Sequence, residues 1–337
     1  MLNNFRFLTA GESHGRCLTA IIDGVPSNLF VDINFINNEL ARRQSGYGRS
    51  SRMQLEKDSV EITAGLHNGK TTGAPICLVI NNKDCEEKDS FTKFRPGHAD
   101  FAGSVKYNLS DLRDVLERSS ARKTAIEVAV GAIAKIILKE FDINCSSKIL
   151  QVGTSLNDFE KEIDKAKAEG DSLGGKFEVS FNNLPIGLGS YVQWDKSLDG
   201  KIAQAVMSIG GIKVVEIGEY PLGKKGSEYH DELFVNDGKI FRKTNNAGGI
   251  EGGITNGEDL VVKAVMKPIP TMIKPLNTVD KNSLCECKAH FERSDTCAVE
   301  ACSVVAEAKI ACILVDELLS KFGGDSIEEV KRHYKDS

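Results

Sequence analysis

The sequence predicts a mixed α/β (α+β) fold in which central helices lie between antiparallel sheets, and three features of the 337-residue chain support this fold class. Two long segments rich in small apolar residues carry few charges, as buried helices do. Several short runs alternate apolar and polar residues, which is typical of half-exposed strands and unlike the continuous apolar runs of a doubly wound parallel sheet. No Pro- or Ser-rich linker divides the chain, so we expect residues 1–337 to form a single domain.

The helices are predicted from apolar residues at helical spacing and from capping residues at their starts. The two longest open with a Glu-Arg-Ser sequence and consist mostly of Ala, Ile and Val. An internal pseudo-twofold and chance similarity both explain this likeness, because no long repeat period is present. The predicted helices cover 32–44, 117 to about 141, about 298–322, and a short segment that a capping box opens at 326.

The strands are predicted from runs of β-branched and aromatic residues with a period of two. They cover 20–22, 59–64, 76–80, 176–181, 213–217 and 260–266.

Composition excludes several classes of protein. The formal net charge is −5, whereas nucleic-acid binding needs a basic face. No apolar run approaches the roughly 18 residues of a membrane span, and the first residues lack a secretion signal, so we expect a cytoplasmic protein. The nine cysteines fit reduced thiols better than a disulfide framework. Cys285 and Cys287 are too closely spaced for a common zinc site, so no metal is expected.

Two segments are candidate anion sites. Four arginines and no acid occupy 42–52, where a predicted helix ends in a Gly-rich loop. Helix ends often carry arginine for structural reasons, but Arg49 and Arg52 lie in the loop, where guanidinium groups can bind phosphate or carboxylate. The second candidate site is 117–122, where the serines either cap a helix or bind an anion with Arg118.

Two histidines lie in short glycine-bounded turns: His14 in Gly-Glu-Ser-His-Gly and His98 in Arg-Pro-Gly-His-Ala-Asp. Imidazole is well matched to proton transfer near neutral pH, although a single turn histidine is more often a surface residue. The glycine-rich segment 248–257 fits no dinucleotide-binding fingerprint and no phosphate-loop motif, which counts against a Rossmann enzyme or a nucleotide hydrolase.

Taken in order, these motifs closely resemble those of the chorismate synthase family, and the likeness runs from Thr9 to Ser326. The matching segments are 11–15, 42–53, 95–100, 117–124, 248–257, 267–271 and 293–297.

The resemblance implies a β-α-β sandwich assembled as a homotetramer and an enzyme of the carbon–oxygen lyase class. The family converts 5-enolpyruvylshikimate 3-phosphate to chorismate and phosphate by a 1,4-anti elimination, the last step of the shikimate pathway. It uses reduced FMN without net oxidation. NADPH is a candidate reductant for the flavin, and a separate flavin reductase is the alternative.

The resemblance also implies roles for individual residues. His14 is expected to protonate or stabilise the departing phosphate and His98 to keep the reduced flavin monoanionic. Asp295 is expected to assist at flavin N5. The implied catalytic residues are His14, His98, Asp295, Ser13 and Ser120. The implied flavin contacts are Arg118, Ser119, Ser120, Gly210, Gly211, Gly252, Lys267, Pro268, Ile269, Pro270, Thr271 and Arg293. The arginines expected to bind NADPH or substrate phosphate are Arg42, Arg43, Arg49 and Arg52.

The chain departs from the family pattern at Lys123, Gly210–Gly211, Glu300 and in a short 82–95 segment, and weakened flavin binding is a working hypothesis. Two other functions compete with the lyase: an FMN-dependent reductase, and a non-catalytic homologue that binds flavin or anions.

Overall fold

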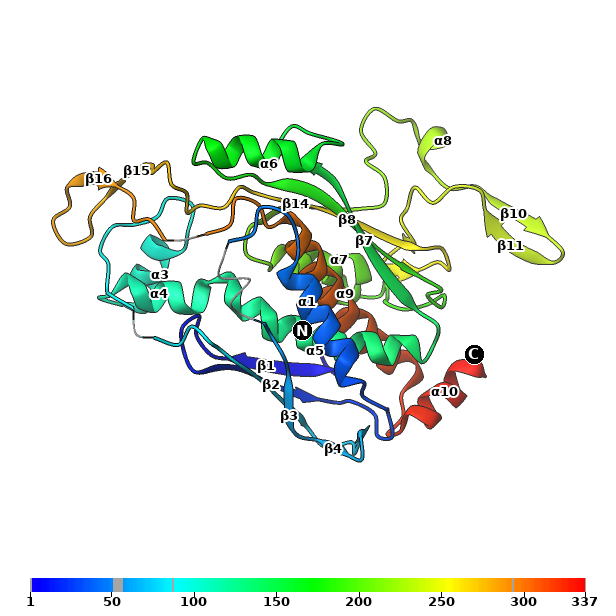
Figure 1. Cartoon of the computed structure of the whole chain (residues 1–337). Helices are drawn as coiled ribbons and strands as arrows, with labels where there is room; N and C mark the ends of the chain where they lie inside the picture. The colour runs from blue at the N-terminus through cyan, green and yellow to red at the C-terminus, as the bar shows by residue number, and fades with distance from the viewer. Residues whose placement is uncertain (1, 51–56, 87, 293, 337) are drawn as a thin grey trace.

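A computed structural model describes residues 2–50, 57–86, 88–292 and 294–336. A layer of helices lies between a lower and an upper antiparallel sheet (Figure 1), so the predicted fold class is confirmed. The lower sheet has the order β1 (Arg6–Ala10), β2 (Cys17–Asp23), β6 (Ile76–Asn81) and β3 (Glu61–Ala64). The upper sheet has the order β7 (Asn144–Val152), β8 (Gly175–Asn182), β14 (Leu260–Met266) and β9 (Ile212–Ile217).

The helices between the sheets include the long apolar ones that the sequence predicts. Gly131 of one central helix lies against Ala308 of the other, where a Cβ on Gly131 would come within 2.2 Å of the Ala308 Cβ. Glycine therefore permits the close approach of the two helices. These inner helices are α1 (Ile33–Gln44), α5 (Thr124–Lys139), α7 (Leu198–Met207) and α9 (Val299–Phe322).

The remaining elements lie around this sandwich. The helix α6 covers the outer side of the upper sheet, and two hairpins project from opposite ends of the molecule (Figure 1). The outer helices are α3 (Asp100–Tyr107), α4 (Leu112–Ser119), α6 (Phe159–Ala168), α8 (Gly226–Tyr229) and α10 (Ile327–Lys335), with 3-10 turns η1 (Ala121–Lys123) and η2 (Trp194–Lys196). The short strand pairs are β4 (Leu66–His67) with β5 (Lys70–Thr71), β10 (Leu233–Asn236) with β11 (Lys239–Arg242), β12 (Ile250–Glu251) with β13 (Ile254–Thr255), and β15 (Asn277–Val279) with β16 (Glu286–Lys288).

The two sheets share one strand order, which supports the internal pseudo-twofold. In each, the first two strands are neighbours, and the last strand in sequence lies between the second and the third. An inner helix connects the second strand to the third in both halves, and a buried central helix follows the last strand. A common order of this length favours a repeat over chance likeness of two apolar helices.

Local signals predicted the starts of several elements correctly. Asp32 accepts a hydrogen bond from the backbone N–H of Asn34 and so caps α1, and Ser326 caps α10 through Glu329 N–H. The cysteines are all free, in agreement with reduced thiols. The prediction that 117–122 opens a helix is wrong, because Glu117, Arg118 and Ser119 end α4 and the chain turns at Ser120 before α5. Among the strands of the two four-stranded sheets, β1 and β7 were not predicted from the sequence.

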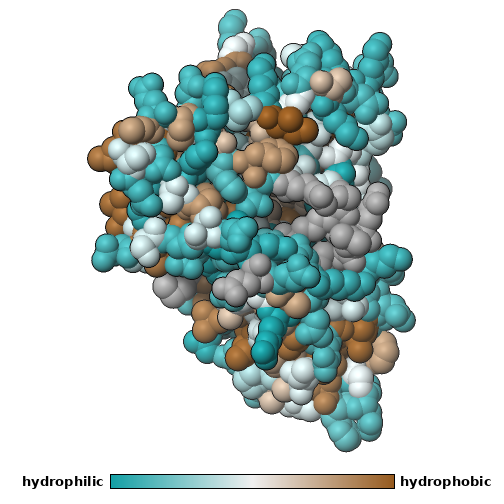
Figure 2. All heavy atoms as spheres, turned by 60° about the vertical axis from the view of Figure 1, so that its left-hand side comes forward, coloured by the Kyte–Doolittle hydropathy of each residue, from teal (hydrophilic) through white to brown (hydrophobic). Residues whose placement is uncertain are grey.

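The end of the molecule that carries α3, α4 and the β15–β16 hairpin is mostly hydrophilic at its surface (Figure 2). No helix in the described segments combines the length and apolar character needed to cross a membrane.

Candidate active site

His14 lies in the turn between β1 and β2 and pairs with a carboxylate from α4. Its Nδ1 lies 2.8 Å from Glu117 Oε1, and its backbone N–H donates to Glu117 Oε2 at 2.7 Å. Burial favours the neutral acid, but the hydrogen bonds and charge of His14, with the charge of Arg113, bring the pKa of Glu117 below its usual value. Because Nδ1 is bound to Glu117, Nε2 is the ring nitrogen left for proton transfer, and it lies 3.7 Å from Asp84 Oδ2.

Several groups hold the His14 turn in place. The Asn82 side-chain amide donates to the carbonyl of Gly15 at 2.7 Å and to that of Glu12 at 3.2 Å. Arg118 donates to the carbonyls of Gly11 and Thr9. Gly11 has φ +107°, and a Cβ there would meet the Cys17 carbonyl at 2.4 Å, so the turn requires glycine.

The two candidate serines lie together beside this turn. Ser120 Oγ donates to Ser13 Oγ at 3.2 Å and also caps η1 by accepting from Arg122 N–H. Ser13 is buried, and its N–H donates to the Glu117 carbonyl at 2.9 Å. The neighbouring Ser119 hydroxyl donates back to Val115 within α4.

His98 has a matching arrangement at the start of α3. Its Nδ1 lies 2.7 Å from Asp100 Oδ1, and Asp100 also accepts two hydrogen bonds from the Arg95 guanidinium, at 2.8 and 2.7 Å. Burial opposes ionisation of Asp100, but the hydrogen bonds and charges of Arg95 and His98 lower its pKa far below the usual value. As at His14, Nε2 is left as the available ring nitrogen.

The segment after β14 packs against the His98 turn. Lys267 donates from Nζ to the carbonyl of Gly97, and Pro270 lies next to Gly97. Burial, with the charge of Lys213, lowers the pKa of Lys267. Farther along, Ile269 O accepts from Ser172 and Thr271 O accepts from Ser294. The carbonyl of Gly211 accepts from Lys267 N–H, and a Cβ on Gly210 would meet no atom within 4 Å.

The loop arginine Arg49 forms an ion pair with Asp295, with Nη1 2.9 Å from Oδ2. Arg43 is buried on α1 and pairs with Asp58 at 3.3 Å. Burial lowers the pKa of Arg43 to about 10, because Asp58 only partly offsets desolvation and the charges of Arg122 and Arg49 add to it.

Buried polar contacts connect Arg43 to the His14 turn. Asp58 accepts two hydrogen bonds from Arg122 Nη1, at 2.7 and 2.8 Å. Arg122 Nε in turn donates to Asn82 Oδ1 at 2.8 Å, and Asn82 holds the turn. Asp58 and Asn82 were absent from the predicted site, because an acid or amide far along the chain gives no local signal of its partner, whereas Arg122 ends the candidate anion site 117–122.

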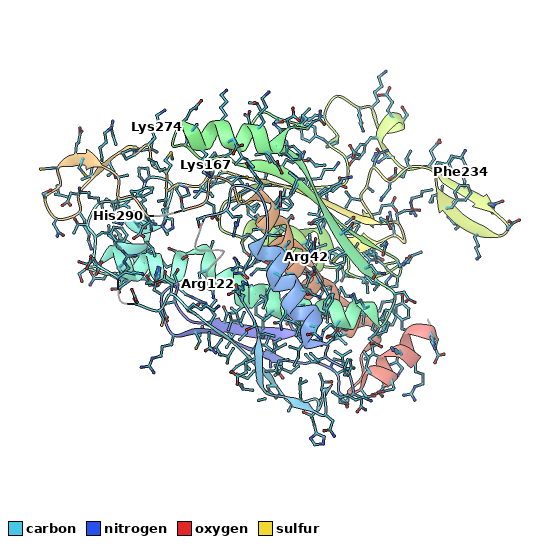
Figure 3. All side chains as sticks on the ribbon, viewed as in Figure 1. Arg42, Arg122, Lys167, Phe234, Lys274 and His290 are labelled. Carbon is cyan, nitrogen blue, oxygen red and sulfur yellow. The ribbon has the colours of Figure 1, made fainter. Side chains whose placement is uncertain are left out.

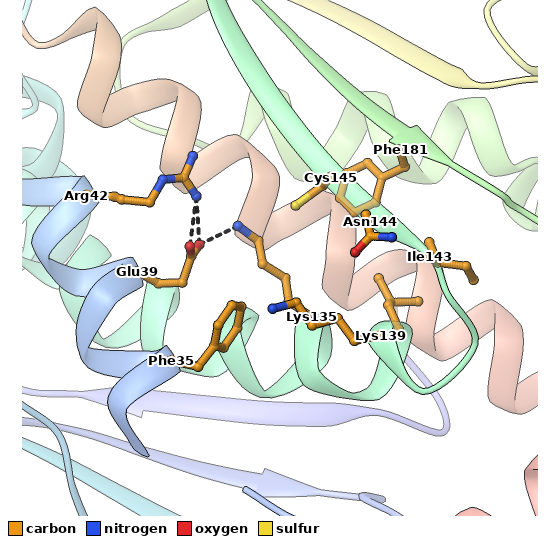
Figure 4. Close-up of a pocket in the computed structure, with 10 residues that line it drawn as sticks. Phe35, Glu39, Arg42, Lys135, Lys139, Ile143, Asn144, Cys145 and Phe181 are labelled. Carbon is orange, nitrogen blue, oxygen red and sulfur yellow. Dashed lines mark hydrogen bonds and ion pairs between the residues drawn. The ribbon is translucent and has the colours of Figure 1, made fainter. Parts of the chain in front are cut away.

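Arg42 is not part of this cluster, which corrects its predicted role in anion binding. It lies beside a cavity of about 250 Å³ on the other side of α1, where its guanidinium pairs with Glu39 (Figure 4). The same guanidinium also pairs with Glu307 of α9. Lys135 of α5 donates to the same two carboxylates. Successive helix residues point about 100° apart, so adjacent arginines serve different networks.

Gly252 lies in the hairpin between β12 and β13 with φ +58°, and a Cβ there would meet no atom within 4 Å. Arg52 and Arg293 lie outside the described residues.

Residues at the family departures also adjoin the site. Glu300 packs against Gly46, where a Cβ would meet the Glu300 Oε2 at 2.8 Å. Lys123 ends η1 directly before α5.

The donor groups of the cluster fit anionic ligands. Within the described chain, buried Nε atoms of Arg43 and Arg49 and Nη1 of Arg113 have no hydrogen-bond partner. Phosphate and carboxylate oxygens match such guanidinium donors. Among the described residues, no group of His, Cys, Asp and Glu is arranged to hold a metal ion.

Comparisons with known proteins identify the family of this chain. The chorismate synthase family model matches residues 5–319. A chorismate synthase of Thermoanaerobacter pseudethanolicus is 54% identical, over 98% of this chain and 97% of that protein. One of Aquifex aeolicus is 47% identical, over 99% and 98%. A crystal structure of chorismate synthase superposes with a TM-score of 0.82 at 42% identity and covers 100% of this chain and 98% of that one. The chain therefore belongs to the chorismate synthase family, whose members are carbon–oxygen lyases.

Proposed function

We propose that this chain converts 5-enolpyruvylshikimate 3-phosphate to chorismate and phosphate by a 1,4-anti elimination at the site of His14 and His98. One observation carries the proposal: each histidine has a carboxylate at Nδ1, and each carboxylate also lies beside an arginine. Loss of phosphate needs a cation or proton donor at the leaving oxygen, and loss of the C6 proton needs an acceptor.

His14 is the proposed proton donor to the departing phosphate. Its Nδ1 is bound to Glu117, so Nε2–H would be the donor to the leaving oxygen while Nδ1 stays bound. Arg43 and Arg49 are the proposed phosphate ligands, since both have buried N–H groups to offer. Ser13 and Ser120, in mutual hydrogen-bond contact, provide a path for a proton beside the turn.

Reduced FMN is the proposed cofactor, and it supplies electron density to the allylic system during the elimination. His98, held by Asp100, would keep the reduced flavin in its monoanionic form when the cofactor is bound. Asp295 offers a carboxylate next to Arg49. We assign the flavin contacts to a set of residues from several segments: Arg118, Ser119, Ser120, Gly210, Gly211, Gly252 and residues 267–271.

An anaerobic assay tests this function. With dithionite-reduced FMN, the wild-type chain is expected to release chorismate and phosphate in equal amounts. His14→Gln and His98→Gln should each lower kcat by about 100-fold or more, as loss of an acid–base group does. Wild-type turnover by either variant would refute its assigned role.

The same assay separates the competing functions. A flavin reductase would oxidise NADPH steadily without forming chorismate, and a non-catalytic homologue would bind flavin without turnover. Replacement of dithionite by NADPH then shows whether the chain reduces its own flavin or depends on a separate reductase.

We also infer a cytoplasmic single-domain chain, residues 1–337, that assembles as a homotetramer. One core cluster includes residues from both sheets, which supports one domain. Leu8 and Ile21 face each other across β1 and β2, yet they are 80% and 51% exposed. Exposed apolar sheet faces of this kind favour association of copies.

A further inference from the structure

A chain of alternating charges extends from Glu117 away from His14. Arg113, one turn earlier on α4, has its Nη1 4.0 Å from Glu117 Oε1. Its Nη2 donates to Glu292 Oε1 at 2.7 Å. The same oxygen of Glu292 lies 3.1 Å from His290 Nε2. The series therefore runs from His14 through Glu117, Arg113 and Glu292 to His290, and the last two come from the segment after β16.

Aromatic packing fixes Arg113 in this position. The guanidinium lies 5.1 Å from the Phe91 ring centroid, and His290 stacks on that ring at 4.2 Å. Arg113 Nε donates to the Asp89 carbonyl at 3.0 Å. Its side chain is only 12% exposed, so its charge is poorly screened by water.

The same Phe91 ring also lies beside Arg95, which binds Asp100, the carboxylate partner of His98. Arg95, which holds Asp100, has its guanidinium carbon 5.5 Å from the ring centroid. Figure 3 shows His290 at the end of the molecule where the β15–β16 hairpin projects. The hairpin is fastened to the Phe91 segment, because Lys281 N–H donates to the Thr92 carbonyl and Thr92 Oγ1 donates to Asp280.

Glu292 is charged in this arrangement. Burial would raise its pKa, but the hydrogen bonds and charges of His290 and Arg113 hold it below the usual value. Arg113 thus lies between the carboxylates of Glu117 and Glu292. The negative charge of Glu292 partly offsets the positive charge that Arg113 presents to Glu117.

We propose that Arg113 and Glu292 are positioning residues for His14, which act through Glu117 by setting the charge beside the imidazole and hence the pH at which it gains a proton. The proposal rests on the proposed function, in which His14 must be protonated to donate. Neither residue touches the ring of His14 in the structure, so both act through Glu117.

The direction of each effect follows from charge. Arg113→Gln removes a positive charge near His14, which favours the imidazolium and raises its pKa. Glu292→Gln removes a negative charge and leaves Arg113 unbalanced beside Glu117, which lowers the pKa of His14. The charged or titratable groups around the His14–Glu117 pair come from three segments besides its own turn. They are Glu12 of that turn, Asp84 and Lys88 after β6, Arg113 on α4, and His290 and Glu292 after β16.

Histidine C2 hydrogen–deuterium exchange, read by mass spectrometry on the full-length protein, tests this proposal. The method reports protonation of each histidine ring and needs no turnover, so it remains decisive if the proposed function fails. We expect opposite shifts of at least about half a pH unit in the two variants, and a value near wild type in the double variant. Shifts of the same sign, or none, would overturn the proposal.

Control variants separate charge from folding. Glu140→Gln neutralises a carboxylate that pairs with Lys331 far from the site, and it should leave the His14 titration unchanged. Arg113→Lys keeps the charge and should restore a titration close to wild type, whereas a purely structural role would not distinguish Lys from Gln. Thermal unfolding by circular dichroism identifies any variant that is not folded, and the remaining variants still provide the comparison of sign.

Discussion

Two clusters of charged side chains lie on opposite sides of α1, and they differ in net charge. On one side Arg42, Lys135, Glu39 and Glu307 neutralise one another around a cavity. On the other, Arg43 shares Asp58 with Arg122, and positive charge exceeds negative. A balanced cluster stabilises the packing of three helices, whereas a cluster with surplus donors is suited to an anionic ligand.

The largest expected effect lies on the balanced side. Lys135→Met should lower the free energy of unfolding by about 3–5 kcal/mol, because it leaves Glu39 and Glu307 buried together with one cation instead of two. Urea unfolding followed by circular dichroism measures this change. Lys331→Met, which breaks a half-buried pair with Glu140, is the matched control and should cost less than about 1 kcal/mol. Equal losses in the two variants would contradict the comparison.

Low pH should also lower the free energy of unfolding, because it protonates Glu307 in the neutral cluster on α1, α5 and α9. Burial opposes ionisation of Glu307, but Arg42 and Lys135 lower its pKa from 4.5 to about 2. Because the folded pKa lies below the unfolded one, this stabilisation is full above pH 4.5 and is lost as the pH falls towards 2, to a maximum of about 3 kcal/mol. Unfolding free energies measured across this range should fall less steeply in Glu307→Gln. An unchanged slope would show that Glu307 is not the titrating group.

Adjacent substitutions on α1 sharpen the contrast further. Arg43→Gln should lower kcat/KM for the substrate about 100-fold, as expected for loss of a buried cation at a developing phosphate charge. Arg42→Gln should leave kcat/KM within about twofold and cost about 2 kcal/mol of stability through its lost hydrogen bonds to carboxylates. Steady-state kinetics under anaerobic conditions, with urea unfolding of both variants, provides the measurement. A large kinetic defect in Arg42→Gln would reassign it to the site.

Local sequence signals predicted much of the fold, because caps, apolar periodicity and turn residues act over a few positions. Asp32 and Ser326 cap the predicted helices, and all the predicted strand segments overlap observed strands. The missed strand β7 contains the polar run Asn-Cys-Ser-Ser-Lys, which has little of the expected alternation. Its pairing with β8 supplies what its own residues do not indicate.

The candidate site was predictable in its principal residues and not in their partners. The motifs around His14 and His98 identified both histidines, and the short-range partner Asp100 lies in the same motif. Glu117, by contrast, is 103 positions away from His14 in the sequence. Asn82, the residue directly after β6, contacts the same turn. No periodicity or cap relates residues so far apart.

By itself the sequence determined the fold class, the family and the two histidine turns, because these depend on local pattern and on motifs in order. Only the tertiary structure decided that Arg42 pairs with Glu39 and Glu307 while Arg43 pairs with Asp58, that Glu117 binds the imidazole of His14, and that Asn82 holds its turn. The physical reason is that charge acts through space. The energy of a buried ion depends on which distant segments the packed sheets and helices bring within a few ångströms of it.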